Sequence, residues 1–278
     1  MLEPAFYLLA ATLVGLCVGS FLNVVIHRLP IILDRGWQAQ CAELRGETVA
    51  EQPAYNLVVP RSQCPACGHP ISAMENIPVI SWLALAGKCK ACKAPITVRY
   101  PIVELMGGAL AAAAIYRFGP TAAGAAACLF LWTLLGLTWI DFDTQLLPDN
   151  MTLPLLWGGL IANLWGLFVP LSAAVIGAVA GYLTLWSIYW LFKLIRGKEG
   201  MGYGDFKLLA ALGAWLGWQM LPVIVLLSSV VGAGVGIILI VFKGRDHNVP
   251  LAFGPYLAIA GALALFFGPT LVRLYFPV

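Results

Sequence analysis

The stretch GMGYGDFK, residues 200–207, places an aspartate and three glycines between two long apolar segments. The surrounding chain of 278 residues is 61% hydrophobic and only 10% charged, and its mean hydropathy is +0.88. A chain with so few charged residues cannot cover itself with polar surface as a soluble globule does. The composition therefore predicts an integral membrane protein, in which this motif marks the start of one membrane segment.

A membrane-spanning helix needs about 20 mostly apolar residues, each adding about 1.5 Å of rise. Eight such runs are bounded by charged residues, Pro or Gly: residues 5–26, 102–117, 121–140, 152–169, 171–193, 206–218, 219–242 and 252–275. The sequence thus predicts an all-α polytopic membrane protein with about eight transmembrane helices. If the break at Trp218-Gln219 is instead a bend, seven spans result and the termini lie on opposite sides.

The basic residues orient this arrangement, because Lys and Arg in short loops stay on the cytoplasmic side. With eight spans and both termini outside, only Arg117 and Arg273 of the 16 basic residues remain outside. The other fourteen fall in inner loops: Arg28, Arg35, Arg45, Arg61, Lys88, Lys90, Lys93, Arg99, Lys193, Arg196, Lys198, Lys207, Lys243 and Arg245. This asymmetry accounts for the net charge of +3 without a nucleic-acid partner. The first run lacks the flanks of a cleaved signal peptide, so we interpret it as a helix.

One inner loop, residues 28–101, is far longer than the others and predicts a cytoplasmic domain inserted between the first helix (residues 1–27) and the remaining core (residues 102–278). It contains Cys64-Pro-Ala-Cys67 and Cys89-Lys-Ala-Cys92, with 21 residues between the two pairs. Four thiolates at this spacing are typical of a structural zinc site that holds together a loop with little core of its own.

Other uses of these cysteines fit the sequence less well. A redox role would need one CxxC in a βαβ pattern, and disulfides are rare on the reducing side of the membrane. Haem attachment needs CxxCH, but Gly68 separates Cys67 from His69, so we interpret His69 as a neighbour of the metal site or a surface residue rather than a ligand. The isolated cysteines, Cys17, Cys41 and Cys128, are interpreted as packing or incidental residues.

Carboxylates near membrane segments are costly and are therefore candidates for function. Five qualify by position: Glu104, Asp141, Asp143, Asp149 and Asp205. Glu104 is either a cap in the first turn of the second helix or a site residue, and Asp149 or Asn150 is a candidate N-cap of the fourth helix. Asp143 lies about 200° around a helix from Asp141 and is expected to face solvent.

Asp141 and Asp205 stand apart because the topology places both at the cytoplasmic face, one where the third helix ends and one where the sixth begins. Paired carboxylates share a proton, so one acts as base toward water while the other acts as acid. This is the arrangement of an aspartyl protease, although carboxylates alone would also suit proton-coupled transport. The alternate glycines, Gly200, Gly202 and Gly204, would let an extended peptide approach Asp205 closely, and they lack the spacing of a dinucleotide site.

Several motifs together resemble a known family. Gly202-Tyr-Gly204-Asp205-x-Lys207 follows Ile140-Asp141 and Leu147-Pro-Asp149, as in the GxGD aspartyl proteases of the bacterial type IV prepilin peptidase family. The stretch Gly19-Ser-Phe-Leu-Asn-Val-Val-Ile-His-Arg-Leu-Pro30, both CxxC pairs, Arg99-Tyr-Pro-Ile-Val-Glu104 and Phe253-Gly-Pro-Tyr256 also agree, in the order of the family.

The resemblance implies an enzyme of the bacterial inner membrane with its site at the cytoplasmic face. It would cleave the basic leader of type IV prepilins and type II secretion pseudopilins after a glycine, then methylate the new N-terminus with S-adenosylmethionine. Asp141 and Asp205 would be the catalytic pair and Cys64, Cys67, Cys89 and Cys92 the zinc set. No Gly-rich signature for S-adenosylmethionine occurs, so its residues are not assigned.

Substrate contacts are a separate hypothesis. Gly202 and Gly204 would meet the substrate near the cut, and Glu104, Asp149 and Asp143 would receive the basic leader. Lys207 would either meet the substrate or tune the ionisation of Asp205. Two other classes of protein stay open on the residues alone. A proton-coupled transporter would place acids along a path across the membrane, and a zinc-domain membrane adaptor would need neither Asp141 nor Asp205.

Overall fold

The computed structural model describes residues 3–47, 53–197, 201–243 and 251–275. The elements, in chain order, are α1 (Pro4–Leu44), the 3-10 turn η1 (Met74–Asn76), α2 (Ile80–Ala84), α3 (Arg99–Phe118), α4 (Ala122–Thr144), α5 (Asp149–Leu164), α6 (Leu171–Arg196), α7 (Tyr203–Leu216), the 3-10 turn η2 (Trp218–Met220), α8 (Leu221–Lys243) and α9 (Gly254–Tyr275). The described residues form no strand beyond two isolated bridges. The prediction of an all-α chain is confirmed.

Among the described residues, five stretches are long and apolar enough to cross a membrane: α1, α3, α4, α6 and residues Trp218–Phe242 of η2 and α8. They fit a multi-pass membrane protein. The other predicted spans correspond to α5 and α7, with 16 and 14 residues, and to the apolar stretch Gly254–Gly268 of α9. Each predicted run thus contains a helix, while the number of eight spans stays a prediction.

The break near Trp218 separates two helices. α7 ends at Leu216, Gly217 adopts a φ of 81°, and η2 precedes the start of α8 at Leu221. A positive φ is readily adopted only by glycine, so Gly217 allows the chain to leave α7 at this point. α7 and α8 are therefore separate helices, while the choice between eight and seven spans stays a prediction.

α1 differs from its prediction because it does not end near residue 26 but continues to Leu44, through Pro30. Proline removes one helical hydrogen bond, yet the following residues, including Leu33, Gln38, Ala39 and Leu44, are good helix formers. At about 1.5 Å per residue the 41-residue helix is roughly 60 Å long, about twice the hydrocarbon thickness. Its polar second half therefore extends beyond the membrane.

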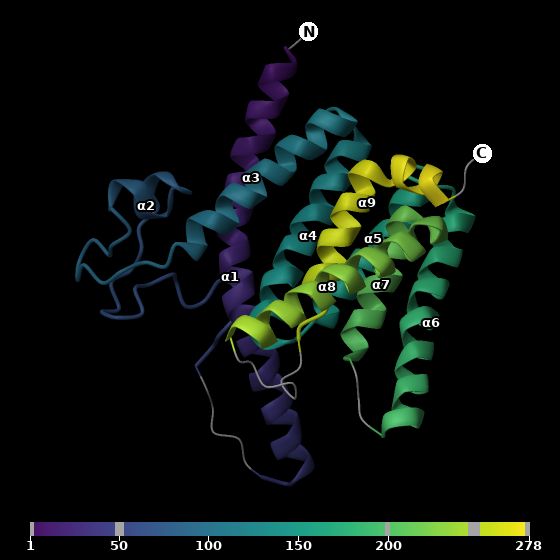
Figure 1. Cartoon of the computed structure of the whole chain (residues 1–278). Helices are drawn as coiled ribbons and strands as arrows, with labels where there is room; N and C mark the ends of the chain where they lie inside the picture. The colour runs from purple at the N-terminus through teal and green to yellow at the C-terminus, as the bar shows by residue number, and fades with distance from the viewer. Residues whose placement is uncertain (1–2, 48–52, 198–200, 244–250, 276–278) are drawn as a thin grey trace. The chain divides into compact units, whose positions relative to one another are not determined.

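The chain forms two compact units, residues 1–120 and residues 121–278. In the first unit α1 packs along α3, and Figure 1 shows α3 crossing α1 with the α2 loop to one side of the pair. Glycines allow this close approach: a β-carbon on Gly19 would lie 2.6 Å from Cα of Glu104, and one on Gly107 would lie 2.6 Å from the carbonyl oxygen of Gly15.

The second unit is built around α7, which packs against α5, α6 and α9. All residues from Leu208 to Leu216 are buried, as expected of a helix that is apolar on every side. With 14 residues it spans about 21 Å, less than the membrane thickness of about 30 Å. In its first turn Asp205 and Phe206 are buried, whereas Tyr203 is exposed, so the Asp205 side chain is enclosed by neighbouring helices next to an exposed ring.

Candidate functional site

The two aspartates singled out by the sequence lie at opposite ends of their helices. Asp141 is in the last turn of α4, and Asp205 is in the first turn of α7. Both side chains are buried, with 5% and 7% of their surface exposed. Burial of two carboxylates in one helical unit is costly unless they serve a function.

Gly254, the first residue of α9, contacts Asp141. Its backbone hydrogen-bonds to the Asp141 carboxylate, and a β-carbon built on Gly254 would lie only 2.6 Å from Oδ2 of Asp141. That oxygen is buried and has no hydrogen-bond partner among the described residues. Any side chain larger than hydrogen at position 254 would displace the carboxylate.

Leu147 connects this contact to Asp205. A β-carbon on Gly254 would lie 3.0 Å from Cδ2 of Leu147, and a β-carbon on Gly204 would lie 2.7 Å from its Cβ. Leu147 therefore packs against the glycine that touches Asp141 and against the residue preceding Asp205. The two carboxylates are close enough to interact electrostatically, so the structure brings the predicted pair into one buried site.

The glycines of the motif have different surroundings. Gly202 is the N-cap of α7 with a φ of −85°, and a β-carbon there would meet nothing closer than 3.9 Å. Gly204 lies inside α7 against Leu147. Neither glycine has a positive φ. Gly200 lies outside the described residues.

Lys207 forms an ion pair with Asp149. Its Nζ lies 2.7 Å from both Oδ1 and Oδ2 of that carboxylate. Asp149 is the first residue of α5 and Pro148 is its N-cap, so the predicted capping role of Asp149 or Asn150 is wrong. The negative charge of Asp149 still stabilises the N-terminus of α5. The ion pair of Asp149 with Lys207 joins the start of α5 to α7.

Glu104 occupies a different environment in the first unit. α3 begins at Arg99, three residues earlier than expected, and has no acid in its first turn, so the helix-capping interpretation is wrong. The side chain is buried, and its Oε2 accepts a hydrogen bond of 2.7 Å from the backbone N–H of Val79. It therefore holds the start of α2, inside the long loop, against α3. Asp143 is exposed, as predicted.

The four predicted cysteines cluster in the first unit, with all their sulfur atoms within 4.8 Å of one another. The Sγ atoms of Cys64 and Cys92 are 3.8 Å apart, and Zn–S bonds of about 2.3 Å in a tetrahedron place two sulfurs about 3.8 Å apart. Backbone hydrogen bonds from Ala66 and Cys67 lower the pKa of the Cys64 thiol to about 7, and backbone hydrogen bonds from Cys92 and Ala91 lower the pKa of Cys89, which favours the thiolate that a metal requires. The neighbouring thiols raise the pKa of Cys67. The cluster fits a metal ion.

Each CxxC pair forms the same turn. Gly68 N donates to Cys64 O and Lys93 N donates to Cys89 O, at 2.9 and 3.0 Å. The residue that closes each turn has a positive φ, 70° at Gly68 and 61° at Lys93. The metal site is therefore assembled from two equivalent knuckles.

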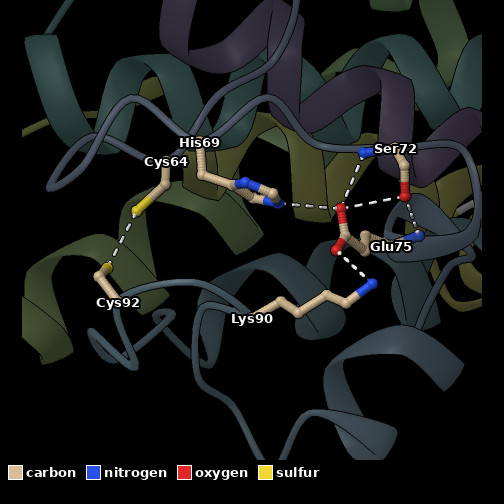
Figure 2. Close-up of polar contacts among 6 residues, drawn as sticks. All are labelled: Cys64, His69, Ser72, Glu75, Lys90 and Cys92. Atoms are coloured by element: carbon tan, nitrogen blue, oxygen red, sulfur yellow. Dashed lines mark hydrogen bonds and ion pairs between the residues drawn. The ribbon is translucent and has the colours of Figure 1, made fainter.

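Glu75 links these knuckles from outside, as Figure 2 shows. His69 Nε2, after the first knuckle, lies 3.4 Å from Oε2 of Glu75, and Lys90 Nζ, inside the second, lies 3.4 Å from Oε1. His69 is not among the clustered ligands, in agreement with its predicted place beside the metal site. Glu75 was not singled out by sequence reasoning, and its only signal is that it is the one acid between residues 53 and 98.

Sequence reasoning also missed three aromatic residues beside Asp205. The rings of Tyr189, Tyr203 and Phe206 have centroids 5.2–5.6 Å from one another, which stabilises the first turn of α7 on α6. Tyr203 lies between Gly202 and Gly204, and this position in the motif was the one sequence feature that could have pointed to it. Leu147 and Gly254 were noted only as members of motifs.

A different family model matches each of the two compact units. Residues 13–118 match the family described as Bacterial Peptidase A24 N-terminal domain, and residues 128–237 match the Type IV leader peptidase family. No solved structure gives a significant match.

Curated relatives are similar over nearly the whole chain, and each is named Prepilin leader peptidase/N-methyltransferase. The protein of Aeromonas hydrophila is 57% identical over 274 residues, which cover 98% of this chain and 94% of the relative. That of Pseudomonas aeruginosa is 55% identical over 274 residues, with the same two shares. That of Burkholderia pseudomallei is 56% identical over 271 residues, covering 96% and 87%. The chain therefore belongs to the type IV leader peptidase family.

Proposed function

We propose that this chain is a prepilin leader peptidase and N-methyltransferase. One observation carries the peptidase half: helices α4 and α7, far apart in the sequence, bring two buried aspartates together around Leu147 and Gly254. The names of the relatives, at 55–57% identity over almost all of the chain, support both halves.

In this proposal Asp141 and Asp205 cleave a peptide bond without a covalent intermediate. Two close carboxylates share one proton. The ionised carboxylate takes a proton from water as the water oxygen attacks the scissile carbonyl, and the protonated carboxyl gives its proton to the carbonyl oxygen. Collapse of the tetrahedral intermediate then breaks the C–N bond, and a carboxyl proton passes to the leaving amine. The unpartnered Oδ2 of Asp141 is available to bind that water.

The substrates we propose are type IV prepilins and type II secretion pseudopilins, cut after a glycine. The open side of Gly202 suits an extended peptide beside Asp205, whereas Gly204 is already in contact with Leu147. Two of the acids proposed to bind the basic leader already have partners. Glu104 accepts a hydrogen bond from the N–H of Val79, and a leader lysine that binds Asp149 would have to displace Lys207.

Zinc is the metal that we propose for Cys64, Cys67, Cys89 and Cys92, because four cysteine sulfurs leave no open position for a catalytic water. Bound there, the ion would cross-link the two knuckles of the loop at residues 28–101. S-adenosylmethionine is the proposed methyl donor. Residues 102–278, which contain both aspartates, would form the peptidase core.

The proposed location is the inner membrane of a bacterium, with the active site facing the cytoplasm and both termini in the periplasm. The support is the distribution of Lys and Arg among the loops and the presence of five helices long enough to cross a bilayer.

The test is to mix the purified protein in detergent with a prepilin, with and without S-adenosylmethionine, and to measure intact masses. We expect loss of the leader in both mixtures and the added mass of one methyl group only with the donor. Cleavage without methylation at saturating donor would remove the methyltransferase half, and an unchanged prepilin would remove the peptidase half.

A further inference from the structure

The long loop presents apolar side chains outward from its short helix. Ile80 and Leu83 of α2 are 65% and 63% exposed, and Met74 of the adjacent turn η1 is 76% exposed. Residues three apart lie on one face of a helix, so Ile80 and Leu83 form a single apolar edge. A soluble surface would not gain from such an arrangement, and neighbouring residues of the loop do not cover it.

This exposure is fixed by the contacts of α2 rather than by mobility. On the opposite side, Trp82 Nε1 donates to the carbonyl of Ile96 at 3.2 Å, and the Trp82 ring fills the space beside Gly87. At the start of α2, Val79 has a φ of 62°, which is strained for a β-branched residue. The surrounding contacts therefore stabilise a conformation that turns Ile80 and Leu83 outward.

The depth of α2 follows from its attachment to α3. The 20 residues of α3 span about 30 Å, the hydrocarbon thickness of a bilayer, so Arg99 marks one boundary. Glu104 lies five residues further, about 7.5 Å along the helix axis, and its carboxylate binds the N–H of Val79. Asn23 of α1 also binds the carbonyl of Tyr100 at 3.1 Å. α2 thus begins beside a position about one and a half helical turns from the membrane boundary.

The charge around α2 suits an anionic surface. Between residues 53 and 98 the only acid is Glu75, which binds His69 and Lys90. The basic residues of this segment are all exposed: Arg61, Lys88, Lys90 and Lys93. Basic residues beside an apolar face are the pattern by which interfacial helices bind the headgroups of anionic lipids.

We propose that α2, with Ile80 and Leu83, inserts into the boundary between headgroups and acyl chains and holds the tetracysteine loop on the membrane surface, next to anionic lipids. The loop is then a peripheral membrane element attached at three points: α1, α3 and the bilayer itself. This inference is independent of the proposed catalytic function.

The experiment places a fluorescent NBD label at single cysteines in the full chain, with Cys17, Cys41 and Cys128 replaced by alanine and the four metal-site cysteines retained. The labelled variants are Ile80→Cys and Leu83→Cys. Leu13→Cys, on the exposed membrane part of α1, and Leu44→Cys, 88% exposed at its far end, are the matched controls. Zinc content verifies that each variant is folded. The protein without an introduced cysteine should take up no NBD, which verifies that each variant is labelled only at the introduced position.

Each variant is reconstituted in phosphatidylcholine nanodiscs, with and without phosphatidylglycerol, that contain lipids carrying a doxyl quencher near the headgroup end or near the methyl end of the chain. We expect blue-shifted emission at positions 80 and 83, with stronger quenching by the shallow doxyl group, and increased quenching when phosphatidylglycerol is present. The label at 13 should respond best to the deep quencher, and the label at 44 to neither.

Water-like, unquenched emission at both 80 and 83 would overturn the proposal. So would blue-shifted emission that neither doxyl lipid quenches, because protein would then cover α2. In the positive case, replacing Lys88 and Lys93 together by glutamine should remove the gain that phosphatidylglycerol gives, and an unchanged gain would overturn the assignment of an anionic surface.

Discussion

Lys207 Nζ lies 2.7 Å from both carboxylate oxygens of Asp149, and this ion pair joins the first residue of α5 to the helix that carries Asp205. Lys207 follows Asp205 by two residues, or about 200° around the helix axis. Its contact with Asp149 therefore directs the ammonium group to α5. The segment between Asp141 and Asp149 is held by this pair at one end and contains Leu147, which packs against Gly204 and Gly254.

The ion pair is predicted to position this segment rather than to perform chemistry. Lys207→Met should slow prepilin cleavage several-fold. The free energy of unfolding should fall by only about 1 kcal/mol or less, because the pair is partly exposed. The charge-exchanged double variant Lys207→Asp with Asp149→Lys should recover most of the activity lost by either single change, as measured by initial rates and thermal unfolding.

The exchange distinguishes this role from direct contact with the substrate. If Lys207 binds the substrate or acts on Asp205, the double variant keeps the defect of Lys207→Asp, and Lys207→Arg has no special advantage over Lys207→Met. Recovery of activity in the charge-exchanged variant requires only that positions 149 and 207 carry opposite charges.

The two glycines of the motif are predicted to differ when each is changed to alanine. Gly204→Ala places a methyl group 2.7 Å from Cβ of Leu147, so overpacking should lower the free energy of unfolding by about 1–3 kcal/mol. Gly202→Ala has open space and should unfold at the wild-type temperature. If a substrate strand approaches there, the variant should raise KM while its stability is unchanged.

Gly234→Ala is the matched control, since nothing lies within 4 Å of a β-carbon at that site in α8. Equal stability loss in Gly202→Ala and Gly204→Ala would contradict the packing described around Leu147.

Glu75 is predicted to stabilise the tetracysteine loop in a pH-dependent way. Hydrogen bonding to the backbone of Ser72, with help from Lys90, lowers the pKa of this carboxyl from 4.5 to about 2. Because the folded-state pKa is depressed, the stabilisation is complete above the unfolded value of 4.5 and is lost as the pH falls through the folded value near 2. Between these values it declines progressively.

The measurement compares unfolding of the wild type and Glu75→Gln, followed by zinc release to an indicator. The variant should release zinc more easily at neutral pH, and the difference should not shrink until the pH falls below about 4.5. Lys88→Gln, in the same loop but not in contact with Glu75, serves as the control. A difference that already fades between neutral pH and 4.5 would show that Glu75 titrates without these partners.

Much of the fold was predictable because apolar composition and length decide helix formation in a membrane. The eight apolar runs each contain a helix, and Gly217 ends α7 where the sequence showed a break. The length of α1 was not predictable in the same way. Pro30 and Arg28 suggested an end, but helix propensity beyond them prevailed.

The site was predictable at the residues whose chemistry is costly to bury. Asp141, Asp205 and the four cysteines follow from charge at a membrane face and from thiol spacing, and the structure brings each set together. Leu147, Gly254 and Tyr189 could not be found by such reasoning, because an apolar residue or a glycine carries no chemical signal in a hydrophobic chain. The roles of Lys207 and Glu104 depend on partners 58 and 25 residues away, which only the folded chain reveals.

The most direct test is single-turnover cleavage of a prepilin by the wild type, Asp141→Asn and Asp205→Asn, with Asp34→Asn, an exposed aspartate of α1, as the matched control. We expect both buried-site variants to leave the prepilin intact while they keep wild-type zinc content and thermal unfolding, and the control to cleave normally. Cleavage at the wild-type rate by either Asp141→Asn or Asp205→Asn would contradict the proposal that these two carboxylates act as a pair.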